Sequence, residues 1–196
     1  VPDAAALRAA LDAIVERHAV LRTVILAPDG VPMGRVLPRT AFPPLLEEID
    51  LRDLGAAAEA EALSRLTAFG QRPFDLARDL RLRALLIQVN EGEALLGLVA
   101  DHGSFDGSSM PVFLAELAAG YAAAAGGAED SFSGPAPLAW QFADWAAWQR
   151  GWLAAGGLEG ALDYWQQHLA GAPPLLELPT DHERRADRTR RWTRPV

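Results

Sequence analysis

Ala100-Asp101-His102-Gly103-Ser104-Phe105-Asp106-Gly107 is the stretch that decides how this chain is organised. It follows an apolar run, residues 94–100, that predicts a buried strand, and it precedes residues 110–121, whose apolar positions recur as in an amphipathic helix. Loops between a strand and a helix commonly carry chemistry in α/β folds. A neutral His102 imidazole there can take a proton from an attacking amine or alcohol near pH 7. Asp106 is expected to brace the loop by pairing inside the protein; the alternative is a polar turn with an exposed, idle histidine.

The rest of the chain alternates predicted helices and strands. Helices are predicted at residues 4–19, 56–69, 139–153 and 158–169, and strands at residues 21–26, 34–37, 45–49 and 82–89, in addition to 94–100. Asp3 is a suitable N-cap for the first helix. The strands at 82–89 and 94–100 are expected to form a hairpin around Asn90 to Glu93. Residues 123–137, rich in small residues and proline, predict a flexible connection.

Composition excludes several classes of function. The net charge of −8 and the pI near 5.0 argue against a surface for nucleic acid or anionic membranes. The chain has no cysteine, so disulfides, thiolate catalysis and cysteine metal sites are excluded, and it has no lysine for Schiff-base chemistry. No apolar run reaches a transmembrane length and no signal peptide pattern opens the chain. A soluble cytoplasmic protein is therefore expected.

The other histidines and the tryptophans have structural interpretations. His18 is expected to pack or cap a helix end, His168 to lie near a helix C-terminus, and His182 to lie in a polar tail. No two of them have metal-ligand spacing, so no metal site is predicted. Six tryptophans follow residue 139, and three of them, Trp145, Trp148 and Trp152, have helical spacing. Packing in a core is predicted for them, and the alternative is a role facing a second lobe or a substrate tunnel.

Five parts of the sequence, in order along the chain, resemble signature segments of nonribosomal peptide synthetase condensation domains. The family patterns are RHxxLRT, PFDL with PLxRxxL, HHxxxDG, YxDYAxWQ, and YWxxxLAGAP with LPTD. The matching segments are residues 16–23 (ERHAVLRT), 72–76 and 80–86 (RPFDL and LRLRALL), 101–107 (DHGSFDG), 140–149 (WQFADWAAWQ), and 164–165, 169–173 and 178–181 (YW, LAGAP and LPTD). Because these segments cover nearly all of residues 7–181, chance similarity is a poor explanation.

The resemblance implies a chloramphenicol acetyltransferase-like lobe of the α/β (α+β two-layer) class, with a mixed sheet packed by helices. The family builds two such lobes around a cleft, and this chain matches the first. Residues 1–180 are accordingly expected to form the N-terminal lobe of a condensation domain. Residues 181–196 are expected to be a polar, arginine-rich tail leading toward the C-terminal lobe, which would be a partner. A fragment is expected rather than a complete natural protein.

The family's chemistry implies roles for individual residues. It joins an acyl or peptidyl thioester on an upstream carrier protein to an aminoacyl thioester on a downstream carrier, each held on a phosphopantetheine arm. No cofactor is expected to bind the lobe itself, and neither nucleic acid nor membrane is an expected partner. His102 aligns with the catalytic second histidine of HHxxxDG. Asp106 is expected to form a buried ion pair with Arg22, and Gly107 to let the donor arm approach closely.

Asp101 departs from the family pattern, which has histidine there. Heterocyclization domains carry DxxxxDxxS instead, and Asp101, Asp106 and Ser109 fit that pattern. They generally lack a histidine at the position of His102, so amide formation ranks first. Ester-forming acyl transfer ranks second and heterocyclization third. A different class of answer is a catalytically incomplete lobe that serves only as a folding or docking unit; the isolated lobe is expected to be inactive.

Overall fold

The structure is a computed structural model that describes residues 2–126, 137–174, 178–179 and 181. It divides into two compact units, Val1–Gln149 and Arg150–Val196, which are described separately. The predicted tail, including His182, lies outside the described residues apart from Asp181. Within the described part of the chain, no helix combines the length and the apolarity needed to cross a membrane.

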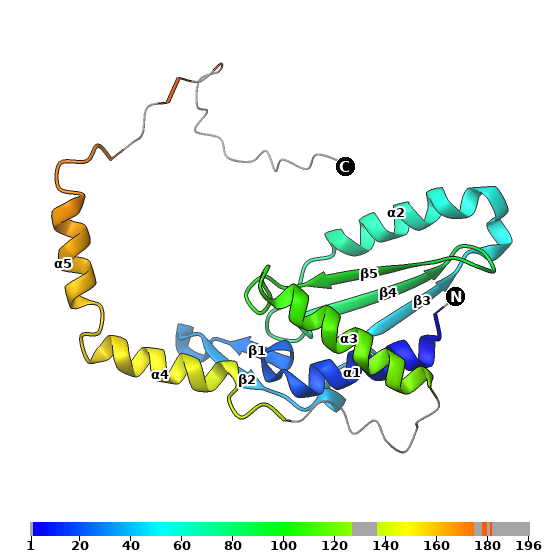
Figure 1. The fold of residues 1–196 in the computed structure, drawn as a ribbon, viewed down its shortest axis with the longest axis horizontal. Helices are drawn as coiled ribbons and strands as arrows, with labels where there is room; N and C mark the ends of the chain where they lie inside the picture. Colours follow the sequence, from blue (N-terminus) through cyan, green and yellow to red (C-terminus); the bar gives the residue numbers. More distant parts are fainter. Residues whose placement is uncertain (1, 127–136, 175–177, 180, 182–196) are drawn as a thin grey trace. The chain divides into compact units, whose positions relative to one another are not determined.

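The first unit is built on a three-stranded mixed sheet (Figure 1). Its strands are β3 (Leu46–Asp50), β4 (Leu82–Gln88) and β5 (Ala94–Ala100), in that spatial order. β3 runs parallel to β4, and β4 pairs antiparallel with β5 so that Leu82 lies opposite Ala100. A separate antiparallel hairpin joins β1 (Thr23–Leu26) to β2 (Met33–Val36). The predicted hairpin of β4 and β5 and the mixed sheet are confirmed.

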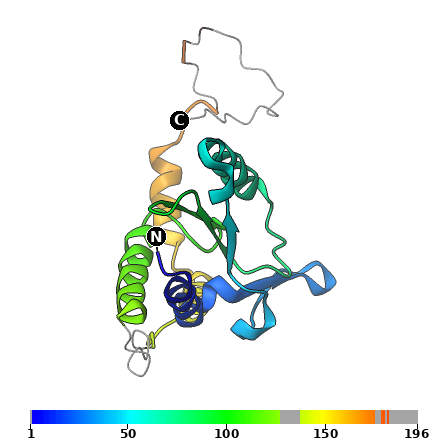
Figure 2. The same cartoon turned by 90° about the vertical axis from the view of Figure 1, so that its right-hand side faces the viewer.

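Helices cover both faces of this sheet (Figure 2). On one face, Leu82, Ala84 and Leu86 of β4 pack with helix α1 (Ala4–Arg17) and helix α3 (Ser109–Ala125). On the other face, Leu85 and Ile87 pack with helix α2 (Ala58–Gln71). The α/β class is confirmed, but the arrangement has three layers instead of the expected two. The reason is that β4 is apolar on both of its faces, which is typical of a strand covered from both sides.

The end of α1 differs from the prediction in one respect. The Asp3 carboxylate accepts hydrogen bonds from the Ala5 and Ala6 amides and caps the helix start, as predicted. The helix ends at Arg17 with His18 as its C-cap, and residues Ala19–Arg22 form a 3₁₀ turn, η1. Strand β1 therefore begins at Thr23, two residues later than the sequence pattern indicates.

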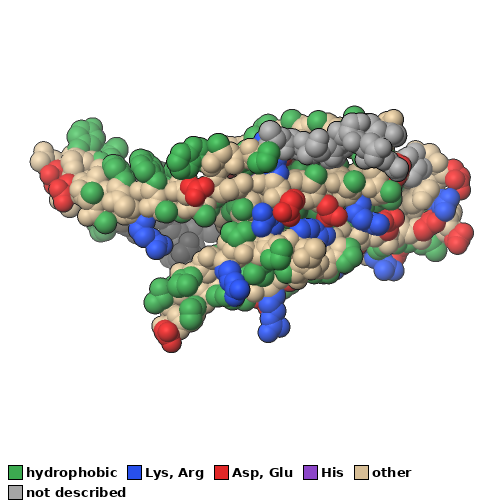
Figure 3. Space-filling model, turned by 90° about the horizontal axis from the view of Figure 1, so that it is seen from below, with side chains coloured by type: hydrophobic (Ala, Val, Ile, Leu, Met, Phe, Trp, Pro, Cys, Tyr) green, Lys and Arg blue, Asp and Glu red, His purple; other side chains and the backbone are tan. Residues whose placement is uncertain are grey.

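Helices α4 (Phe142–Ala154) and α5 (Glu159–His168) follow, separated at Gly156, whose φ is +81°. They confirm the two predicted helices but correct the prediction for the tryptophans, which are not core residues. Trp145 is 48% exposed, Trp148 63% and Trp152 41%. Helical spacing correctly puts them on one helix, yet spacing defines a face and not what covers it. Figure 3 shows hydrophobic side chains standing at the surface among acidic and basic ones.

Candidate active site

The loop from Asp101 to Ser108 joins β5 to α3 and is anchored at its first residue. The Asp101 amide donates to the carbonyl oxygen of Arg81, at the start of β4, with an N···O distance of 2.9 Å. The Ser104 amide donates back to the Asp101 carbonyl at 3.0 Å, which closes a turn around His102. This turn is tight, because a Cβ atom on Gly103 would lie 3.1 Å from Oδ1 of Asp101. The His102 backbone is thus held to the sheet.

His102 lies where the sequence predicts, at a strand end and beside an open pocket. Its side chain is exposed, and the pocket has a volume of about 280 Å³. The other lining residues are Leu82, Leu98, Ala100, Phe105, Asp106, Gly107, Met110 and Phe113. Apolar walls with a few polar groups at one end are typical of a substrate site. His102 supplies the imidazole at the border of this pocket.

Asp106 closes the other end of the loop by capping α3. Its Oδ1 accepts hydrogen bonds from the amide of Ser109 (2.9 Å) and from the Ser109 hydroxyl (2.8 Å). In return, the Asp106 amide donates to the Ser109 Oγ at 3.1 Å, so that the two residues bond reciprocally as in a capping box. The Ser109 hydroxyl and amide, with a smaller contribution from nearby His102, hold the pKa of Asp106 below its usual value. The carboxylate therefore stays ionised at neutral pH.

The expected buried pair between Arg22 and Asp106 is wrong. Asp106 is exposed and bonds locally to Ser109, while the Arg22 guanidinium donates to the carbonyl oxygens of Leu37 (2.9 Å) and Glu16 (3.2 Å). A carboxylate oxygen of Glu16 lies 3.9 Å from Nη2 of Arg22. The physical reason is that Asp106 lies three residues before the Ser109 amide at the start of α3. A local bond to this amide does not require two distant segments to be ordered against each other. Arg22 instead joins α1 to the segment that follows β2.

Arg81 is a site-supporting residue that the sequence analysis missed. Its side chain is only 1% exposed, and it donates from Nε to the Thr23 carbonyl (2.9 Å) and from Nη2 to the Leu76 carbonyl (2.7 Å). Its own amide donates to the Leu21 carbonyl at 2.8 Å. Since its carbonyl also holds Asp101, this one residue links β1 to the start of the His102 loop. The available signal was an arginine between two leucines, immediately before an apolar strand.

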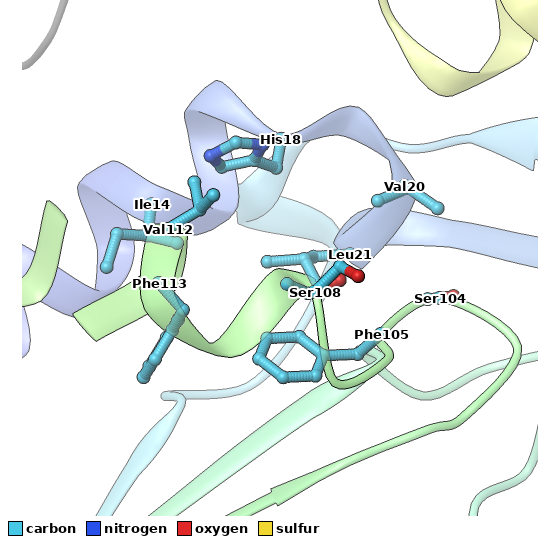
Figure 4. Close-up of a pocket in the computed structure, with 10 residues that line it drawn as sticks. Ile14, His18, Val20, Leu21, Ser104, Phe105, Ser108, Val112 and Phe113 are labelled. Carbon is cyan, nitrogen blue, oxygen red and sulfur yellow. The ribbon is translucent and has the colours of Figure 1, made fainter. Parts of the chain in front are cut away.

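A second pocket, shown in Figure 4, shares Phe105 and Phe113 with the His102 pocket. These two rings meet edge to face, with their centroids 5.8 Å apart, and both line the two pockets. The second pocket also has a volume of about 280 Å³ and lies between α1, η1 and the start of α3. Ile14, Val20 and Leu21 make its walls mainly apolar, and His18 stands at its border. Phe113 thus controls the shape of both cavities.

Comparison with known proteins assigns the family. The family model for the condensation domain matches residues 2–194. This chain belongs to the condensation domain family. Its relatives make it a condensation domain of the nonribosomal peptide synthetase type, and such domains are acyltransferases that work with carrier protein domains.

Individual relatives show the extent of the match. Phosphinothricin tripeptide synthetase PhsC of Streptomyces viridochromogenes is 42% identical over 182 residues, which are 92% of this chain and 16% of that protein. Malpinin synthetase of Mortierella alpina is 36% identical over 182 residues, 92% of this chain and 2% of that protein. The X-domain from teicoplanin biosynthesis superposes with a TM-score of 0.78 at 32% identity, covering 94% of this chain and 39% of that one. The chain therefore spans a small part of these synthetases.

Proposed function

We propose that this condensation domain forms an amide bond between a carrier-bound acyl or peptidyl thioester and a carrier-bound aminoacyl thioester, with His102 acting on the attacking amine. The observation that carries the proposal is the position of His102. It is an exposed imidazole beside an apolar-walled pocket, at the end of β5, in a chain of the condensation family. The site's backbone anchors, Arg81 at one end and the Asp106–Ser109 pair at the other, fix the loop that presents it.

The reaction balances without a bound cofactor. The amine nitrogen attacks the thioester carbonyl carbon, the C–N bond forms, and collapse of the tetrahedral intermediate breaks the C–S bond. His102 takes the proton that the amine loses and returns a proton to the departing thiolate of the phosphopantetheine arm. Asp106 takes no direct part in this proton transfer, because its carboxylate is bonded to Ser109.

Ester formation would use the same imidazole with a hydroxyl acceptor, so the acceptor separates it from amide formation. Heterocyclization would depend on Asp101, Asp106 and Ser109. The last two bond to each other, and Asp101 Oδ1 lies against the turn at Gly103. This arrangement accounts for both aspartates as loop residues, and for that reason we place amide formation first.

The test compares acceptors in a complete condensation domain that carries this chain. Donor carrier loaded with an acyl group is mixed with acceptor carriers bearing an amine, a hydroxyl or a cysteinyl group, and products are resolved by mass spectrometry. We expect the amide to form fastest and to require His102. His168→Ala, at an exposed histidine of α5, is the matched control. A heterocyclic product that needs Asp101 and Asp106 but survives His102→Ala would replace the proposal with heterocyclization.

A further inference from the structure

Glu116, in the first half of α3, binds the end of α1 with both of its carboxylate oxygens. Oε1 lies 3.0 Å from Nε of Arg17, and Oε2 lies 2.7 Å from Nε2 of His18. The Glu116 side chain is 15% exposed, and those of Arg17 and His18 are 18% and 23% exposed. Two neighbouring residues thus contact one partly buried carboxylate, Arg17 by an ion pair and His18 by a hydrogen bond, so that each carboxylate oxygen of Glu116 has a partner on α1 or at its end.

The same end of α1 is held from a third direction. The Gln141 side chain accepts from the Ala19 amide (3.1 Å) and donates to the Arg17 carbonyl (2.9 Å). These bonds use backbone groups that the helix end leaves unpaired. The last turn of α1 therefore has little freedom to move, and Glu116 transfers that fixed position to α3.

The position of α3 in turn fixes the His102 loop. The loop ends at the Asp106–Ser109 pair, which belongs to the first turn of α3, and Met110 and Phe113 of α3 line the His102 pocket. The other end of the loop belongs to the sheet, through Asp101 and Arg81. The distance between the imidazole and the pocket wall hence depends on the position of α3 relative to the sheet. α1 determines this position, because α1 and α3 pack together over the same face of the sheet (Figures 1 and 2).

We infer that Glu116 is a positioning residue for His102, acting through α3 by its ion pair with Arg17 and its hydrogen bond with His18. The structural part of this inference stands on these contacts alone, and only its effect on rate rests on the proposed function. A shift of about 1 Å in a catalytic group can cost on the order of a hundredfold in rate. The side chains of Arg17 and His18, which the RHxxLRT segment supplies, are then part of the site's support.

The first test is hydrogen exchange on the 196-residue chain, which needs no activity. In Glu116→Gln, the amides of Ser104 and Ser109, which close the loop, are expected to exchange about tenfold to a hundredfold faster, since a charge-assisted bond is lost. The amides of Leu85 and Ile87 in β4 report the global stability. Any change in their exchange rates is subtracted from the change at Ser104 and Ser109, and the loop effect is expected to remain after this correction. Glu59→Gln, at an exposed glutamate of α2, is the matched control and should change neither set.

The second test measures rates in a complete condensation domain. Glu116→Gln is expected to lower kcat about tenfold to a hundredfold with little change in KM, and Arg17→Gln should reproduce both the exchange and the rate effects if Glu116→Gln fails to fold. Unchanged loop exchange in a folded variant overturns the inference, as does faster exchange confined to α3 and α1. Failure of the proposed function would give a different result. His102→Ala would then be fully active, while Glu116→Gln would still show faster exchange of the loop amides.

Discussion

Replacing Arg81 with methionine removes the buried guanidinium that links β1 to the His102 loop while keeping most of the side-chain volume. Two hydrogen bonds to carbonyls are lost, and a buried carbonyl left without a partner costs about 1–3 kcal/mol. The Leu76 carbonyl keeps the amide of Ile25 at 2.8 Å, so the larger loss falls on Thr23. Against this, methionine also removes a desolvated charge whose Nη1 has no hydrogen-bond partner among the described residues, and such a replacement can stabilise. We expect the hydrogen bonds to dominate, with a net loss toward the lower end of about 1–3 kcal/mol because the removed charge offsets part of the cost.

The assay is urea unfolding of the 196-residue chain, followed by far-ultraviolet circular dichroism. Arg35→Met is the control, because Arg35 is exposed on β2 and its loss should leave the midpoint unchanged. A lower midpoint with an unchanged denaturant slope would show a loss of stability without a change in the unfolded state. The reasoning is refuted if Arg81→Met is as stable as the unaltered chain or more stable, because the buried charge would then outweigh the hydrogen bonds it makes.

Three further outcomes are expected. The pKa of Asp106 lies below its ordinary value in the folded chain. The stabilising effect of the ionised carboxylate should therefore be fully present above about pH 4 and disappear as the pH falls through the lowered pKa. Ser109→Ala should raise the pKa of Asp106 in a carboxyl titration by NMR. Arg52 lowers the pKa of Asp50 to about 2, and Arg52→Gln should return its titration midpoint toward the usual value, whereas an unmoved midpoint would contradict the contact. Phe113→Ala should cost about 3–5 kcal/mol in unfolding free energy because the ring is buried between two pockets, and a loss below about 1 kcal/mol would show that the ring is not part of the core.

The sequence predicted the parts of the fold that follow from local patterns. The apolar run placed β5 at residues 94–100 without error, and the turn residues between it and β4 identified the hairpin. Asp3 was identifiable as a cap because an N-cap acts on amides only two or three residues away. The loop with His102 lay between two such elements, so its place at a strand end followed directly.

Contacts between distant segments were less accessible to sequence analysis. The resemblance paired Arg22 with Asp106. In the structure, each of these side chains instead bonds to groups that are much closer to it along the chain. Arg81 was missed because a charged residue beside leucines is ordinarily exposed, and only the three-dimensional structure shows the carbonyls that receive it. The prediction that the tryptophans of α4 pack in a core was wrong for a related reason. A helical pattern identifies a face of the helix but contains no information about what covers that face.

The central claim is that His102 performs the proton transfer of amide formation, and one measurement tests it most directly. In a complete condensation domain that carries this chain, single-turnover product formation from carrier-loaded donor and acceptor is compared for the unaltered protein and for His102→Ala. We expect a loss of about 10²–10⁴-fold with the unfolding midpoint nearly unchanged, because the side chain is exposed and contributes little to the core. Product formation by His102→Ala at the unaltered rate would contradict the claim.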